Sequence, residues 1–170
     1  TARLGVLAAA MAARNSGGLV IAQVKRLAMA GTLNAKHVVV PGHLVDVLVV
    51  DPGQWQTVTD AYNPAYSGEI RVPFTEAEPM PLTERKVVAR RALAEIPRGA
   101  VVNLGVGMAD GVASVALEEG RLADLTLTVE QGIVGGVPAR GVIFGVSWNP
   151  DAVIDHSAQF DFYDGGGLDV

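Results

Sequence analysis

Residues 125–136 read Leu-Thr-Leu-Thr-Val-Glu-Gln-Gly-Ile-Val-Gly-Gly, an apolar, β-branched run that leads a single carboxylate into a glycine-rich turn. Apolar residues alternate with threonine over 125–129, a pattern typical of a β-strand. The glycines that follow permit backbone geometry, and the close approach of a large ligand, that a Cβ would obstruct. Glu130 is therefore the candidate reacting group, and Gly132 is a candidate binding position. The same stretch also fits a strand that runs into a surface turn with an exposed glutamate.

The segment before this strand predicts a βαβ unit. Residues 100–104 form an apolar strand, residues 105–111 a glycine loop, and Asp110 to Glu119 a helix with apolar positions at helical spacing. In such sheets ligands bind beyond the carboxyl ends of the strands, where both the Gly105 loop and Glu130 would lie.

Composition narrows the class of function. The 170 residues are 49% hydrophobic, carry a net charge of -5 and contain no cysteine. No apolar run reaches the ~18 residues of a membrane span, and no basic cluster offers a nucleic-acid surface. The absence of cysteine excludes disulfides and thiolate metal sites and allows a reducing compartment, so a cytoplasmic location is expected. A protein that acts on a small molecule is therefore favoured over one that binds nucleic acid or spans a membrane.

The first third of the chain predicts the end of an earlier α/β unit. A helix is expected over 2–14, buried by its Ala/Leu/Met/Val content. The run at 19–24 indicates a parallel strand covered on both faces, and 37–40 and 44–50 indicate two further strands.

Five prolines between Asp51 and Pro81 indicate an interdomain connection. The predicted division is 1–56 for the first domain, 57–81 for the connection and 82–170 for the second domain. Thr83 is placed to cap a helix whose apolar face would hold Val87, Val88, Leu93 and Ile96.

Gly105, Gly107 and Gly111, with Glu130 further on, also approximate a Rossmann-like dinucleotide-binding fingerprint. The third glycine is displaced, and the carboxylate of Asp110 would oppose a pyrophosphate. The dinucleotide-binding domain is therefore the alternative interpretation.

No metal site is predicted. His37, His43 and His156 are scattered, and Asp151, Asp155, Asp161 and Asp164 lack the alternating spacing of a calcium loop.

Several motifs together resemble family I coenzyme A (CoA) transferases of the long single-chain acetate/propionate and 3-oxoacid type. They are Asn-Leu-Gly-Val-Gly-Met-Ala-Asp-Gly at 103–111, Thr-Val-Glu-Gln-Gly at 128–132 and Gln-Phe-Asp-Phe-Tyr-Asp-Gly-Gly-Gly-Leu at 159–168. Earlier segments at 13–18, 21–24, 40–42 and 84–91 agree. The resemblance implies an α/β fold with parallel-sheet, NagB/RpiA-like CoA-transferase domains.

By this resemblance Glu130 matches the glutamate of a short E-x-G motif that forms a covalent thioester with CoA. Gly105, Val106, Gly107 and Gly132 would line the CoA pocket. The implied activity is CoA transfer between an acyl-CoA and a short-chain carboxylic acid, as in short-chain fatty acid or ketone body metabolism. CoA would be a substrate, with no permanently bound cofactor.

Family members are much longer, and the G-x-G-G-F element that they use as an oxyanion hole has no counterpart here. The domains are therefore expected to be incomplete in this chain, completed by the remaining segments of the same polypeptide within a homo-oligomer. Activity of the 170-residue piece alone is doubtful on this basis, and a catalytically silent assembly fragment is the other alternative.

Overall fold

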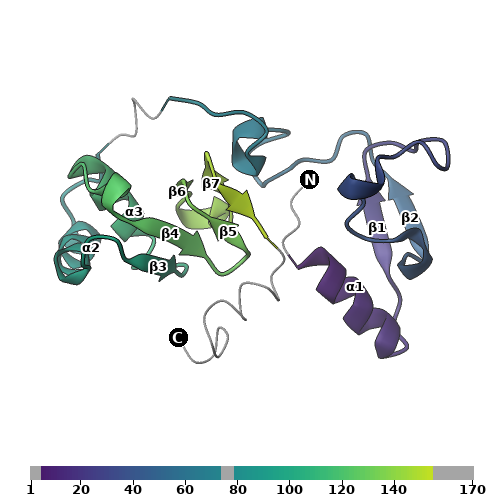
Figure 1. Cartoon of the computed structure of the whole chain (residues 1–170), viewed down its shortest axis with the longest axis horizontal. Helices are drawn as coiled ribbons and strands as arrows, with labels where there is room; N and C mark the ends of the chain where they lie inside the picture. Colours follow the sequence, from purple (N-terminus) through teal and green to yellow (C-terminus); the bar gives the residue numbers. More distant parts are fainter. Residues whose placement is uncertain (1–4, 74–78, 155–170) are drawn as a thin grey trace.

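The computed structural model describes residues 5–73 and 79–154, which form two α/β units joined by an irregular connection (Figure 1). Mixed α/β architecture with parallel strand pairs agrees with the predicted fold class. In Figure 1 the unit with α1, β1 and β2 stands apart from the unit with α2, α3 and the remaining strands.

The first unit contains α1 (Val6–Asn15), β1 (Ile21–Val24) and β2 (Val47–Val50). α1 ends where Gly17 takes a left-handed φ of 72°. β1 and β2 are parallel, with Ile21 opposite Val47. The carboxylate of Asp46 accepts from the Val20 N–H at 2.9 Å, which anchors the entry to β2 beside β1.

Two expectations for this unit are wrong. The predicted strand at 37–40 is absent, because the chain forms a 3-10 helix at Ala35–His37, and the second predicted strand begins only at Val47 after another 3-10 helix at Gly42–Leu44. The helix and strands are also not buried: all four β2 residues are exposed, and Ala10 is the buried residue of α1. Apolar runs signal burial, but the described residues supply no layer to cover this sheet.

The second unit begins with α2 (Glu84–Glu95) and β3 (Val101–Leu104), followed by α3 (Gly111–Glu118) and β4 (Thr126–Val129). β3 and β4 are parallel neighbours, so β3, α3 and β4 form the predicted βαβ unit. The short strands β5 (Ile133–Val134) and β8 (Ala152–Val153) extend the sheet in the order β3-β4-β5-β8 through antiparallel pairs. β6 (Val137–Pro138) and β7 (Ser147–Trp148) form a separate antiparallel pair.

The core of the second unit lies between the two helices and the sheet. Its fully buried side chains include Leu93 of α2, Val115 of α3 and Leu127 of β4. The predicted apolar face of α2 is partly wrong. Leu93 is buried and Ile96 packs against the core as predicted, but Val87 and Val88 are 57% and 46% exposed, and Ala89 is buried in their place. A residue as small as Ala89 lets α3 approach closely: a Cβ added at Gly111 would lie 3.1 Å from the Ala89 methyl group.

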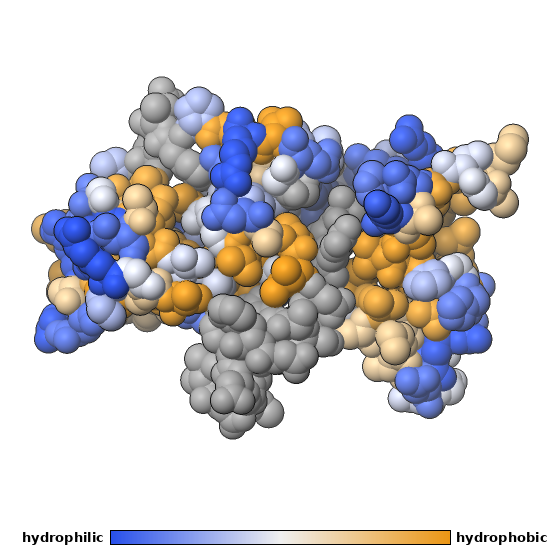
Figure 2. Space-filling model, in the orientation of Figure 1, coloured by the Kyte–Doolittle hydropathy of each residue, from blue (hydrophilic) through white to orange (hydrophobic). Residues whose placement is uncertain are grey.

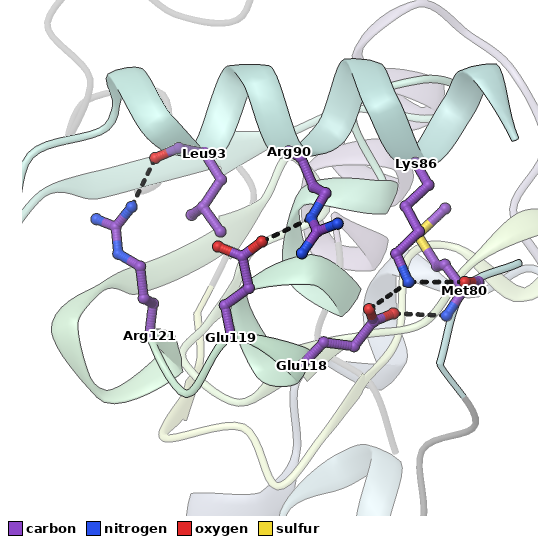
Figure 3. A network of polar contacts seen from close by, with 7 residues as sticks. All are labelled: Met80, Lys86, Arg90, Leu93, Glu118, Glu119 and Arg121. Carbon is purple, nitrogen blue, oxygen red and sulfur yellow. Dashed lines mark hydrogen bonds and ion pairs between the residues drawn. The ribbon is translucent and has the colours of Figure 1, made fainter. Parts of the chain in front are cut away.

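Polar contacts join α2 to α3 and the turn after it (Figure 3). Lys86 pairs with Glu118 at 2.6 Å, and Arg90 pairs with Glu119 at 2.8 Å. The guanidinium of Arg121 donates to the Leu93 and Ile96 carbonyls at 2.7 and 2.9 Å, which satisfies acceptors at the end of α2. The basic residues of α2 therefore orient the helix against its neighbour.

The connection packs onto the second unit. Tyr66, in the 3-10 helix Pro64–Ser67, is 5% exposed and meets Trp148 of β7 edge to face with ring centroids 4.7 Å apart. Asn149 accepts from the Val72 N–H at 2.9 Å and donates to the Val72 carbonyl at 2.7 Å. Residues 64–72 thus pack against β7 and the residue after it, and we call this segment the strap.

Candidate functional site

The register of the parallel strands brings the glutamate and the glycine loop to one edge of the sheet. Leu104 is opposite Val129, so the next residues, Gly105 and Glu130, both leave the carboxyl end of the β3–β4 pair. Neighbouring strands lie about 4.8 Å apart, so these two backbones begin side by side. The sequence prediction that both elements share this edge is correct.

Glu130 begins the turn that follows β4. Thr128 and Val129 are buried, whereas Glu130 is exposed. Within residues 5–73 and 79–154, the Glu130 carboxylate forms no hydrogen bond or ion pair, so no described side chain or backbone group holds it. Burial of the preceding residues fixes its backbone without covering its side chain.

The Gly132 turn is held by the chain on both sides. Gly132 has a left-handed φ of 104°, and its N–H donates to the Val129 carbonyl at 3.0 Å. Its own carbonyl accepts from the Ile154 N–H at 2.8 Å. This geometry suits glycine and ties the turn to the end of β8.

Gly135 and Gly136 are needed for the chain to pack against itself. A Cβ on Gly135 would lie 2.0 Å from a carboxylate oxygen of Asp151, and one on Gly136 would lie 2.2 Å from the Trp148 carbonyl oxygen. The close approach that the sequence indicated at these two glycines is therefore an approach of the chain to itself.

The loop at 105–107 is open by contrast. A Cβ added to Gly105 or Gly107 would meet nothing within 4 Å, and Val106 is 70% exposed. In the part of the chain that the structure describes, the N–H groups of Val106 and Gly107 have no recorded acceptor. The loop thus offers unpaired donors to a negatively charged group near Glu130.

Asp110 closes the loop at the start of α3. Its side chain is buried, one carboxylate oxygen accepts from the Gly141 N–H at 3.3 Å, and the other pairs with Arg85 at 3.5 Å. A buried, partnered carboxylate at this position does not suit a pyrophosphate, so the geometry disfavours the dinucleotide-binding alternative.

Sequence reasoning missed two residues of the second unit, Arg85 beside the glycine loop and Asn149 beside Gly136. No local pattern distinguishes Arg85 from Arg90 or Arg91. Asn149, which has a left-handed φ of 52°, could have been suspected from the Asn-Pro turn at 149–150.

No three His, Cys, Asp or Glu side chains gather among the described residues, and no helix there is long and apolar enough to cross a membrane. His156, Asp155, Asp161, Asp164 and the motif at 159–168 lie outside the described residues.

Comparison with known proteins identifies relatives over almost the whole chain. It is 50% identical over 167 residues to the caffeate CoA-transferase of Acetobacterium woodii, with 96% of the chain matched, and 48% identical over 168 residues to the acetate CoA-transferase YdiF of Escherichia coli K12, with 98% matched. The chain is homologous to CoA-transferases. The resemblance drawn from the sequence motifs is thereby confirmed, although no family model matches.

Solved CoA-transferase structures agree with this homology. The apoenzyme of YdiF from E. coli O157:H7 superposes with a TM-score of 0.78 at 44% identity, covering 94% of this chain and 29% of YdiF. A thioester complex of YdiF with CoA superposes with a TM-score of 0.77 at 44% identity, covering 92% of this chain and 28% of YdiF. The chain spans about a third of the length of the CoA-transferases it matches.

Proposed function

We propose that the polypeptide containing this chain transfers CoA between an acyl-CoA and a short-chain carboxylic acid, with Glu130 as the nucleophile. The observation that carries the proposal is the shared edge: a solvent-facing carboxylate and a loop with unpaired N–H donors follow paired residues, Val129 and Leu104, of adjacent parallel strands. The CoA-transferase relatives and the CoA thioester complex of YdiF support the same chemistry.

The reaction starts with attack of a Glu130 carboxylate oxygen on the carbonyl carbon of the acyl thioester. The C–S bond breaks, and CoA thiolate leaves a mixed anhydride. The thiolate then attacks the glutamyl carbonyl, the anhydride C–O bond breaks, and a free carboxylate departs from a glutamyl-CoA thioester. An incoming carboxylic acid reverses these steps.

The glycine loop contributes electrostatic stabilisation in this proposal. Negative charge develops on the carbonyl oxygen at each attack, and preorganised N–H donors lower the energy of that state. Val106 and Gly107 carry such donors, and Gly105 leaves space for the thioester beside them. Gly132, two residues after Glu130 in the same turn, would contact CoA on the Glu130 side of the site.

The division of the chain follows from the same proposal. Residues 1–56 close one CoA-transferase domain, 57–81 connect it to the next, and 82–170 begin the domain that carries Glu130. The exposed sheet of the first unit would be covered by further segments of the same polypeptide in a cytoplasmic homo-oligomer.

Trapping the intermediate tests the function. The complete polypeptide is incubated with acetyl-CoA, and the peptide containing Glu130 is examined by mass spectrometry before and after borohydride reduction. We expect a CoA adduct on Glu130 that reduction converts to the alcohol, and none in Glu130→Gln. Absence of an adduct on a wild-type protein that transfers CoA contradicts Glu130 as the nucleophile, and absence of both adduct and transfer favours a silent assembly role.

A further inference from the structure

Arg85 is the basic residue of α2 that reaches the glycine loop. Its guanidinium donates to the Gly107 carbonyl and also pairs, through the same nitrogen, with Asp110 at 3.5 Å. The other oxygen of Asp110 accepts from the Gly141 N–H. α2, the loop and the turn at 141 are therefore joined at one buried carboxylate.

The contact with Gly107 sets the orientation of a peptide group in the loop. Gly107 has a φ of 113°, a region that glycine enters without steric cost and also leaves easily. Among the described residues, no side chain lies within 4 Å of its Cβ position to limit the loop by packing. The hydrogen bond from Arg85 restrains the peptide group between Gly107 and Met108, and through Gly107 it restrains the adjoining peptide group, which carries the Gly107 N–H.

Arg85 differs in this respect from the other basic residues of α2. Lys86 and Arg90 pair with α3, and Arg91 pairs with Glu95 one turn along its own helix, with the two side chains 74% and 67% exposed. Among the described residues, none of these three forms a hydrogen bond or ion pair with residues 105–107.

We propose that Arg85 is a positioning residue for the CoA-transfer reaction, holding the Gly107 carbonyl so that the loop N–H groups are oriented toward the oxyanion formed beside Glu130. This inference rests on the proposed function. Arg85 acts through the backbone of the loop and does not touch the reacting atoms.

The test compares Arg85→Gln with the matched control Arg91→Gln, both in the complete polypeptide. Because oriented donors act in the transition state, we expect Arg85→Gln to lower kcat for glutamyl-CoA formation about 10-fold to 100-fold while the KM for acetyl-CoA changes less than threefold. Arg91→Gln should keep the wild-type kcat. Arg85→Lys should be intermediate, because an ammonium is a point charge without the guanidinium fork.

Crystal structures of the two variants separate positioning from stability. In Arg85→Gln, the backbone of residues 105–108 should take another conformation, and β4 should superpose on the Arg91→Gln control. Wild-type kcat in Arg85→Gln overturns the inference, and so does a lower kcat with residues 105–108 in the same conformation as in the control. If Arg85→Gln does not fold, an Arg85→Lys protein with wild-type kcat and an unchanged loop overturns it instead. A wild-type protein that forms no glutamyl-CoA contradicts the proposed function itself.

Discussion

At the scale of single residues, the glycines of this chain divide into those the fold needs and those left open at the site. Gly135 and Gly136 are crowded by Asp151 and Trp148, whereas Gly105 and Gly107 face open space. The two open glycines differ in backbone conformation, because Gly107 has a positive φ and Gly105 does not. Gly105 is therefore the position at which a side chain tests ligand approach without backbone strain.

Gly105→Val should reduce CoA transfer by at least about 10-fold and change the midpoint of thermal unfolding little, because an added Cβ has no described atom within 4 Å and the branched side chain would meet the thioester. Steady-state kinetics and calorimetry on the complete polypeptide measure the two effects. Gly136→Ala is the contrasting variant: its Cβ clashes with backbone, so we expect a loss of several kcal/mol of stability. Equal losses of stability and activity in Gly105→Val would contradict a binding role for the loop.

Any substitution of Glu130 should severely reduce CoA transfer. Glu130→Ala should abolish transfer, and Glu130→Asp should nearly do so, because removing one methylene group withdraws the nucleophile from the thioester. Labelled acetate exchange into acetyl-CoA without a second acceptor measures the half-reaction. Turnover at the wild-type rate in Glu130→Ala would exclude Glu130 as the nucleophile.

At the scale of elements, the α2–α3 contact depends on one ion pair with little solvent access. The side chains of Lys86 and Glu118 are 12% and 18% exposed, and Glu118 also accepts from the Met80 N–H at 2.5 Å. The hydrogen bond from Lys86 holds the pKa of Glu118 below its usual range, although partial burial opposes that shift. The stability of the contact between α2 and α3 therefore depends on pH through the charge of Glu118.

Glu118→Gln should lose about 1–2 kcal/mol of local stability at neutral pH. Because the folded pKa of Glu118 is lower than the unfolded value, the wild-type advantage is complete above about pH 5 and disappears as the pH falls below about 4.3 and through the folded pKa. Hydrogen exchange of peptides covering α2 and α3 measures the difference. Glu95→Gln, in an exposed pair, should cost at most about 0.5 kcal/mol; an equal cost in both variants would refute the assignment.

The strap from 64 to 72 depends on Asn149 in two separable ways. Asn149→Gly keeps the left-handed backbone but removes both hydrogen bonds to Val72, so exchange in the strap should accelerate. Asn149→Ala should cost about 1 kcal/mol more, because its Cβ opposes that backbone conformation. Asn34→Ala, which removes a local cap from the Lys36 N–H, should leave the strap unchanged. Unaltered exchange in Asn149→Gly would show that the remaining contacts hold the strap: the Tyr66–Trp148 ring contact, the Arg71–Asp151 ion pair and the backbone bond from the Asn149 N–H to the Ala65 carbonyl.

At the scale of the whole molecule, exposed apolar side chains are unevenly distributed over the described surface. Many of the exposed large apolar side chains lie in β1, β2 and the segments beside them, including Leu19, Ile21, Leu48 and Val50, and others, such as Val87 and Val142, lie in the second unit. Figure 2 shows apolar atoms gathered over the unit with α1, β1 and β2. A two-stranded sheet in which β2 is exposed and β1 is half-buried only at alternate residues is marginal in water, so this unit gains stability from whatever covers it.

The 170-residue chain studied alone should therefore associate in a concentration-dependent way. Size-exclusion chromatography with light scattering measures its mass, and a double variant Leu48→Thr, Val50→Thr should lower the fraction associated, because less apolar area remains exposed. Ala89→Ser, in the core of the other unit, should not lower it. A monodisperse monomer with a cooperative melt would contradict this expectation.

The sequence by itself determined the βαβ unit and the edge at which Glu130 and Gly105 meet. Strand and helix periods are local properties of the chain, and two parallel strands joined by a helix must place their carboxyl ends together. Those facts need no knowledge of distant segments. Only the tertiary structure decided that Asp110 is buried against Arg85, that Gly135 and Gly136 make room for the chain itself, and that β2 is exposed. Burial and charge pairing depend on which surfaces meet across long sequence separations, and an apolar run or a basic helix face has the same local pattern whether or not a partner covers it.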